Sequence, residues 1–234
     1  VLHSHLPYVL SHGRWPHGTD WLCEAAAETY LPIIRVLGEL IEEGCRPKLT
    51  IGLSPVLCEQ LADNAFKEEF VVYLNQKIKA ARDDAEEFYK YDQHNMLQTA
   101  HLWESFYQRT LEQFDHIGQD ILFEFKSLQD GGYLEIITCG ATHGYYPLLS
   151  RDESLQAQTK AAVKNYEKHF GRKPRGIWLP DFSAFDPDQV DKLDWLIYQL
   201  KQHGIYTNLN LHVSYTYPGI PESAPGEFLF GKGL

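Results

Sequence analysis

The chain has 234 residues and a formal net charge of −11, and it contains no basic stretch. This balance excludes nucleic acid as a partner, because phosphate binding needs clustered Lys and Arg. A hydrophobic fraction of 44% with 23% charged residues is typical of a globular protein with one large domain or a little more. Since no apolar run is long enough to cross a bilayer, we expect no membrane partner.

The cysteines are scattered along the chain without CxxC spacing, at Cys23, Cys45, Cys58 and Cys139. This pattern indicates neither a zinc site nor a disulfide framework. We therefore expect free thiols and a cytoplasmic protein. Because the sequence opens on a hydrophobic segment and not on Met, we also expect a fragment of a longer protein.

The predicted elements alternate between strands and helices in chain order. A first strand over 1–6 leads into a loop rich in Gly, Pro and aromatic residues, and helices follow from Trp21 and from Pro32. The second of these helices is closed by Gly44. Later strands are predicted at 48–54, 133–138, 175–179 and 205–213, and later helices at 64–129, 150–170 and 186–203.

This series of five strands predicts an α/β protein with a parallel sheet. One architecture that fits is part of a (β/α) barrel, and an open doubly wound sheet is the alternative. The helical stretch over about 64–129 is too long for a plain crossover, so we interpret it as an insertion between strands 2 and 3.

His3 and His5 alternate on the first strand, so their imidazoles should point the same way at its carboxyl end. Three interpretations are open: a pair satisfied within the core, a metal site, or hydrogen-bonding groups for sugar hydroxyls. A metal site needs further ligands at later strand ends, and the sequence offers only His143 and Asp181 there. The metal interpretation is therefore the less favoured.

Other aromatic and polar residues also follow strands. Trp21 comes after the first loop, where it either stacks on a sugar or packs the loop onto the fold. His143 follows the third strand, and Trp178 lies at the end of the fourth. Because parallel strands end at one edge, we expect these side chains to converge with His3 and His5, where both architectures place active sites.

Several longer motifs occur in a fixed order. They are HSHLPYV at the first strand, WPHG and WLCEAAAETYLP after it, IGLSPVL at the second strand, TCGATHGYYPLL after the third, and RDESLQAQ followed by RKPRGIWLP up to the fourth. Through these motifs residues 1–180 resemble glycoside hydrolase family 57, and most of all its 1,4-α-glucan branching enzymes and related α-amylases.

The resemblance implies an incomplete, seven-stranded (β/α) barrel and a retaining enzyme that acts on α-1,4-glucans without a cofactor or a catalytic metal. It implies that His3, His5, His143 and Trp178 line the donor glucose site, and we keep Trp21 as a further candidate for substrate binding. The family's nucleophile is a Glu directly after the WLP motif, and its acid/base is an Asp further along the chain.

The sequence departs from the family at that point. Asp181 stands where the family has Glu, and no motif for the acid/base follows. Residues 182–234, with LDWLIYQLK leading into GIYTNLNLHVS, instead resemble a segment of cellulase-like (β/α)8 glycosidases. We therefore expect a seam near 179–185, with residues 1–181 from the family 57 barrel and 182–234 from a cellulase-like βα segment.

The leading functional hypothesis is a fragment of a carbohydrate-active enzyme of glycogen metabolism. It would cleave α-1,4-glucan and transfer the piece to a 6-hydroxyl through a covalent glycosyl intermediate, with little activity on its own. One alternative is a non-catalytic glucan-binding protein. Another is a metal-dependent hydrolase, such as a deacetylase, that uses His3 and His5.

Overall fold

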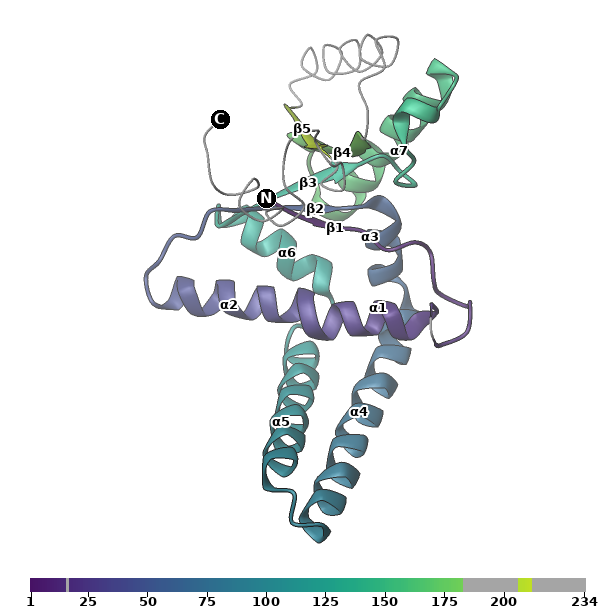
Figure 1. Cartoon of the computed structure of the whole chain (residues 1–234). Coiled ribbons are helices and arrows are strands. Elements are labelled where there is room, and N and C mark those ends of the chain that lie inside the picture. Colours follow the sequence, from purple (N-terminus) through teal and green to yellow (C-terminus); the bar gives the residue numbers. More distant parts are fainter. Residues whose placement is uncertain (16, 183–205, 212–234) are drawn as a thin grey trace, which may run out of the picture.

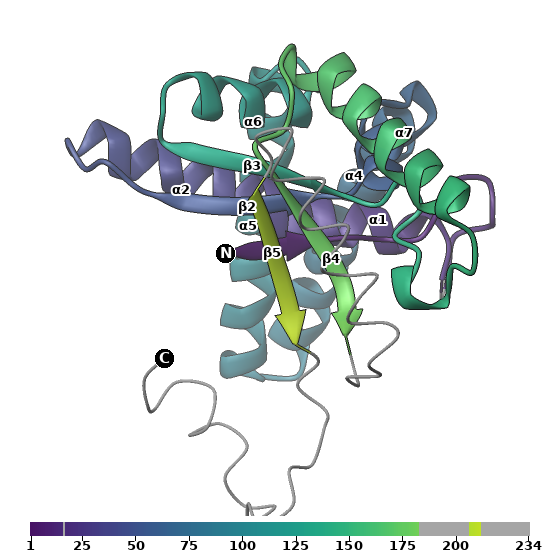
Figure 2. The ribbon, with the colours of Figure 1, turned by 90° about the horizontal axis from the view of Figure 1, so that it is seen from above.

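The protein is built on a parallel sheet covered by helices. A computed structural model describes residues 1–15, 17–182 and 206–211, and at 147, 180–182 and 206–211 it describes the backbone alone. Within this part of the chain five strands form one sheet in the order β1-β2-β3-β4-β5, and all neighbouring strands are parallel (Figure 1 and Figure 2). The predicted α/β class is confirmed.

Each strand lies where the sequence predicts one, with shifts of a few residues at the ends. The strands are β1 (Leu2–Ser4), β2 (Leu49–Leu53), β3 (Leu134–Cys139), β4 (Gly176–Phe182) and β5 (Tyr206–Leu211). In the register of β1 with β2, His3 lies opposite Gly52. In that of β3 with β4, Cys139 lies opposite Trp178. These two registers position the histidine and the tryptophan expected at the carboxyl edge.

Three helical segments follow the first loop without interruption: α1 (Thr19–Ala25), the π-helical η1 (Ala26–Tyr30) and α2 (Leu31–Glu42). The predicted glycine end of α2 is confirmed. Gly44 has a φ of +83°, and its N–H donates to the carbonyl oxygen of Ile41 at 2.9 Å.

The insertion expected over 64–129 consists of three helices: α4 (Asn64–Lys90), α5 (His94–His116) and α6 (Ile121–Asp130). α4 and α5 pack along each other as a hairpin that projects away from the sheet (Figure 1). The turn between them contains Asp92 at a φ of +56°. No Gly or Pro stands there, and the sequence analysis predicted no break at this point.

Two further helices lie against the sheet. α3 (Pro55–Ala62) follows β2 directly and was missed by the sequence analysis, while α7 (Asp152–Phe170) precedes β4 and ends at residue 170, as predicted, with Gly171 as its C-cap. α3, α6 and α7 contact one another, and α6 and α7 contact β3. The helix predicted over 186–203 lies outside the described residues.

The core joins the insertion to the sheet layer. α4 turns one face inward, where its phenylalanines Phe66 and Phe70 are fully buried. Phe70 meets Phe114 of α5 edge-on, with ring centroids 4.8 Å apart. Burial of each such side chain stabilises the fold by about 1.5–3 kcal/mol. The base of the hairpin is therefore fixed to the domain that carries the site.

Candidate functional site

Four of the predicted site residues come together at the carboxyl edge of the sheet. His3 is on β1, His5 follows it, His143 lies in the loop after β3, and Trp178 is on β4. The Nε2 atoms of His3 and His143 are 2.8 Å apart, which is a hydrogen bond between the two rings. The convergence expected from strand order is therefore present for these four.

The four rings stack in a row. Trp178 lies over His3 with centroids 4.7 Å apart and planes at 7°, and His143 lies over His5 at 3.9 Å and 8°. The centroids of His3 and His143 are 4.9 Å apart, which links the two pairs. All four side chains are half-buried, so the row has both a packed side and an accessible side. We call these four residues the histidine row.

Gly52 makes room for the ring of His3 in the histidine row. A Cβ atom at this position would lie 2.9 Å from Nδ1 of His3, closer than real side chains approach. Nδ1 is itself buried and has no hydrogen-bond partner among the residues that the structure describes. A backbone without a side chain is therefore what allows His3 to sit against β2.

Ser54 holds His5, the ring at the opposite end of the row from Trp178. Its Oγ lies 3.0 Å from Nδ1 of His5 and accepts a hydrogen bond from the backbone N–H of Leu57 at 3.3 Å. It is the N-cap of α3 and is fully buried. The sequence analysis did not single out Ser54 or Gly52. The signal was present, however, since Ser followed by Pro is a typical helix start.

The loop that carries His143 is anchored on α7. The N–H and hydroxyl of Thr142 bond to the side-chain amide of Gln158 at 2.8 and 2.9 Å, and the N–H of His143 donates to the carbonyl oxygen of Gly140 at 2.9 Å. His143 adopts a φ of +55°, a region that a non-glycine residue enters only at a cost. The loop therefore holds this imidazole in one place.

His3 and His5 are uncharged at neutral pH. Burial, followed by the proximity of His143 and then of His5, lowers the pKa of His3 to about 3. Burial and then the proximity of His143 lower the pKa of His5 to about 4. Neutral imidazoles offer one donor and one acceptor each and attract no anion, which suits a neutral polyhydroxylated ligand.

Trp21 and Asp181 are placed differently from this row. Trp21 is on α1, 38% exposed, and its ring meets His17 edge-on at 5.7 Å. Asp181 is in β4, three positions after Trp178, and its side chain lies outside the described part of the structure. The pairing of β4 with β5 shifts register between Leu179 and Phe182, an interval that contains Asp181.

Among the side chains that the structure describes, no group of three or more His, Cys, Asp or Glu is arranged to hold a metal ion. Two imidazoles of the row, those of His3 and His143, bond directly to each other through Nε2.

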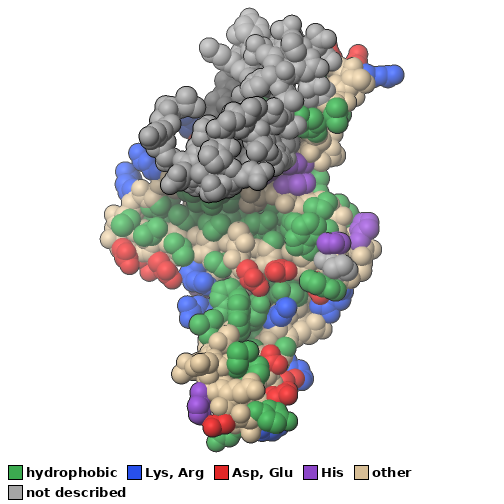
Figure 3. Space-filling view, in the orientation of Figure 1, with side chains coloured by type: hydrophobic (Ala, Val, Ile, Leu, Met, Phe, Trp, Pro, Cys, Tyr) green, Lys and Arg blue, Asp and Glu red, His purple; other side chains and the backbone are tan. Residues whose placement is uncertain are grey.

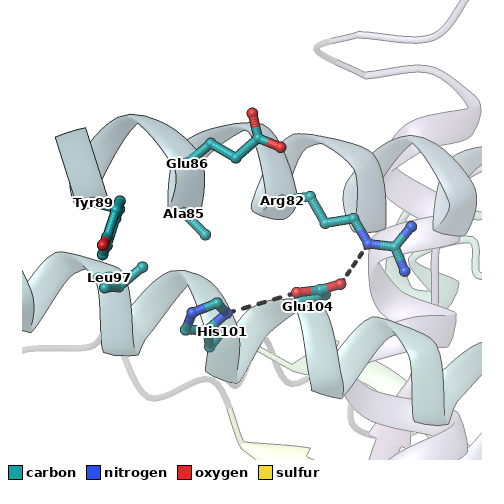
Figure 4. A pocket seen from close by; sticks show the side chains of 7 residues that line it. All are labelled: Arg82, Ala85, Glu86, Tyr89, Leu97, His101 and Glu104. Carbon is teal, nitrogen blue, oxygen red and sulfur yellow. Dashed lines mark hydrogen bonds and ion pairs between the residues drawn. The ribbon is translucent and has the colours of Figure 1, made fainter.

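A separate hollow lies between α4 and α5 (Figure 4). Glu104 bonds to Nε of Arg82, and its other oxygen lies 3.7 Å from Nδ1 of His101. Arg82, His101 and Glu104 thus interact with one another, and the ion pair of Arg82 with Glu104 connects the two helices. On the face seen in Figure 3, acidic, basic and apolar side chains are interspersed over the hairpin.

The fold and the site together define a class of protein. Parallel strands in sequential order, with functional side chains converging at their carboxyl ends, are typical of α/β enzymes. A sequence model of glycosyl hydrolase family 57 matches residues 1–207. The chain belongs to this family.

Known relatives agree with this assignment. The chain is 42% identical over 181 residues to the 1,4-alpha-glucan branching enzyme TK1436 of Thermococcus kodakarensis, a match that covers 77% of this chain and 26% of that protein. A probable 1,4-alpha-glucan branching enzyme of Mycobacterium tuberculosis is 28% identical over 209 residues, with 82% of this chain and 38% of that protein covered.

Solved structures show the same fold. The family 57 branching enzyme of Pyrococcus horikoshii matches with a TM-score of 0.74 and 46% identity, covering 76% of this chain and 33% of that chain. The alpha-amylase AmyC of Thermotoga maritima matches with a TM-score of 0.75 and 32% identity, covering 87% and 37%. The present chain thus spans well under half the length of these relatives.

None of the helices in the described ranges combines the length and the apolar character that a membrane span requires.

Proposed function

We propose that the chain is the N-terminal part of the catalytic domain of an α-glucan-active enzyme, most like a 1,4-α-glucan branching enzyme. The observation that carries this proposal is the histidine row at the carboxyl edge of the sheet, in which His3 and His5 are uncharged at neutral pH. Two relatives named as branching enzymes match most of this chain and support the choice of substrate.

The proposed architecture is the incomplete, seven-stranded barrel of family 57. The strand order supports it, because the described strands follow one another without a reversal. In a doubly wound sheet the order reverses at a switch point, and the ligand binds there.

In this proposal the histidine row is the donor glucose subsite. His5 and His143 exchange hydrogen bonds with sugar hydroxyls, and Trp178 contributes an aromatic wall. Since His3 covers one face of Trp178, at a centroid distance of 4.7 Å, the sugar meets the rest of the indole. Trp21 remains a candidate for a more distant contact with the glucan chain.

The reaction is retaining glycosyl transfer. The carboxylate of Asp181 attacks the anomeric carbon, and the glycosidic C–O bond breaks as a general acid protonates the departing 4-oxygen. A 6-hydroxyl then displaces the carboxylate and loses its proton to the same acid/base. The two carboxyl groups need a separation of about 5–5.5 Å. Because Asp is one methylene shorter than Glu, the reach of Asp181 limits the rate.

A second candidate is a glucan-binding protein without turnover. The Asp at position 181 favours it, since misplacing a reacting atom by about 1 Å costs about 100-fold in rate.

The origin of residues 182–234 from a cellulase-like barrel stays a prediction. The family match runs on to residue 207, and β5 pairs with β4 in parallel. The genomic sequence across codons 170–190 tests the seam. A cytoplasmic location is also proposed, and it is supported by four free cysteines.

Calorimetric titration with maltoheptaose tests substrate binding. We expect binding by the full chain, no measurable binding of cellohexaose, and loss of maltoheptaose binding in Trp178→Ala. The matched control is Trp103→Ala, which removes a tryptophan from α5 that is 39% exposed. Equal loss in both variants, or equal affinity for the two oligosaccharides, contradicts the proposal.

Fluoride release from α-maltosyl fluoride tests the nucleophile, because fluoride leaves without help from a general acid. We expect slow release by the full chain, none by Asp181→Ala, and up to about 100-fold faster release by Asp181→Glu. Binding without release in all three proteins favours the second candidate.

A further inference from the structure

Ser54 is fully buried between the end of β2 and the first turn of α3. Its backbone N–H donates to the carbonyl oxygen of Ser4 at 3.2 Å, which fixes it beside β1. Its Oγ makes two hydrogen bonds in the described structure, one with the N–H of Leu57 and one with Nδ1 of His5. Ser54 therefore connects a helix cap to the site.

The donors and acceptors around this hydroxyl can be assigned. A serine hydroxyl has one hydrogen to donate and two lone pairs that accept. The bond from Leu57 uses a lone pair, because a backbone N–H can only donate. The hydrogen of Oγ then has Nδ1 of His5 within reach, at 3.0 Å. If Nδ1 carried a proton instead, the buried hydroxyl would keep its hydrogen without an acceptor, which is costly.

We propose that Ser54 is a positioning residue that holds His5 in the tautomer protonated at Nε2, so that His5 presents a hydrogen-bond donor to the ligand. This inference rests on the proposed function only in naming the ligand as a glucan. The tautomer itself follows from the contacts of Ser54.

The same reasoning extends along the histidine row. Nδ1 of His3 is buried against Gly52 without a partner among the described residues, and an unmatched lone pair costs less there than an unmatched N–H. His3 therefore carries its proton on Nε2 and donates it to Nε2 of His143. His143 in turn carries its proton on Nδ1. Each ring has a defined tautomer before any ligand arrives.

The fixed tautomer of His5 favours ligand binding. A donor fixed in advance costs little entropy when it meets a hydroxyl oxygen of the sugar. Protonation of His5 to a cation is disfavoured, because the positive end of the α3 dipole lies beside His5. The titratable neighbours of His5 in the row are His143 and His3. A glucan hydroxyl that meets His5 is therefore expected to accept from it.

Imidazole nitrogen NMR on the full chain, labelled with ¹⁵N-histidine, tests the proposal without a ligand. At pH 7 we expect the His5 signals of the Nε2-protonated tautomer. Ser54→Thr retains both hydrogen bonds and should retain this tautomer. Ser54→Asp retains the helix cap, since Asp is a good N-cap, but it only accepts, so it should move the proton to Nδ1 and raise the pKa of His5.

A matched control separates the helix cap from the tautomer. Asp63 caps α4 by accepting from the N–H of Ala65 at 2.8 Å, away from the row. Asp63→Ala should lower stability without changing the signals of His5. We expect Ser54→Asp to weaken maltoheptaose binding about tenfold, as the loss of one hydrogen bond does. Ser54→Thr and Asp63→Ala should leave affinity within about twofold.

The outcomes are distinguishable. Protonation of His5 at Nδ1 in the unmodified chain, or a tautomer unchanged in a folded Ser54→Asp, overturns the role of Ser54. The expected tautomers with His5 signals that do not respond to maltoheptaose leave the role of Ser54 intact and contradict the proposed function instead.

Discussion

The substitution Gly52→Ala tests how the histidine row is held in place. The added Cβ atom would lie 2.9 Å from Nδ1 of His3, whereas its next contact, with Cγ1 of Ile137, is an ordinary 3.6 Å. The strain therefore falls on one ring. To restore a van der Waals separation of about 3.5 Å, the ring of His3 has to move by roughly half an ångström.

His3 has little freedom to make that movement. It is stacked on Trp178 at 4.7 Å and hydrogen-bonded to His143 at 2.8 Å. Overpacking of this kind costs about 1–3 kcal/mol. For a domain of this size that corresponds to a melting temperature lower by about 2–12 °C. Because the displaced ring no longer supports His143, affinity for maltoheptaose should fall about tenfold as well.

Thermal unfolding and calorimetric titration measure the two effects, and Gly38→Ala is the control. Gly38 is on α2, and a Cβ there meets nothing within 4 Å. The free energy of unfolding of Gly38→Ala should be higher by about 0.5–1 kcal/mol, because Ala has the greater helix propensity. Its affinity for maltoheptaose should equal that of the unmodified chain.

The reasoning is refuted if Gly52→Ala leaves both stability and affinity unchanged. A double-mutant cycle gives a second check, since the clash requires the ring of His3. In a His3→Ala background, Gly52→Ala should cost little further stability. An equal cost in both backgrounds would show that the ring is not what Gly52 accommodates.

Three further predictions concern stability. Lowering the pH from 7 to 5 should lower the melting temperature, because His3 and His5 take up protons near pH 6.5 in the unfolded chain, whereas in the folded chain their pKa values are lowered to about 3 and 4. The stability that these two histidines contribute is present above pH 6.5 and is lost as the pH falls below it. A steeper loss in His3→Asn than in the unmodified chain would contradict this prediction. In urea unfolding, His143→Gly should be more stable than His143→Ala by about 1 kcal/mol, since the backbone φ is +55°, and the reverse order would exclude strain. Tyr166→Phe should lose about 1–2 kcal/mol, because it removes a buried hydrogen bond to Gln129 at 2.8 Å, and a change in glucan affinity there would be unexpected.

Much of the fold follows from local pattern. The apolar strand segments and the helix ends marked by Gly44 and Gly171 could be located because these signals lie within a few residues of each other. The break between α4 and α5 could not, because the residue that takes up the positive φ there is Asp92, and no Gly or Pro marks the turn. The eight-residue α3 was missed because it follows β2 directly, with no loop between them.

The site, too, could be predicted from the sequence only in part. Strand alternation placed His3 and His5 on one side, and strand order brought His143 and Trp178 to the same edge. Which ring contacts which could not be predicted, because that depends on tertiary distances. The stacking of Trp178 on His3 and the support from Ser54 are of this kind.

A crystal structure of the full chain with maltotetraose tests the central claim most directly. The account predicts a glucose ring at the carboxyl edge of the sheet, with hydroxyl oxygens within hydrogen-bonding distance of His5 and His143 and one face against Trp178. A bound oligosaccharide elsewhere on the protein, with the histidine row left uncontacted, would contradict the account.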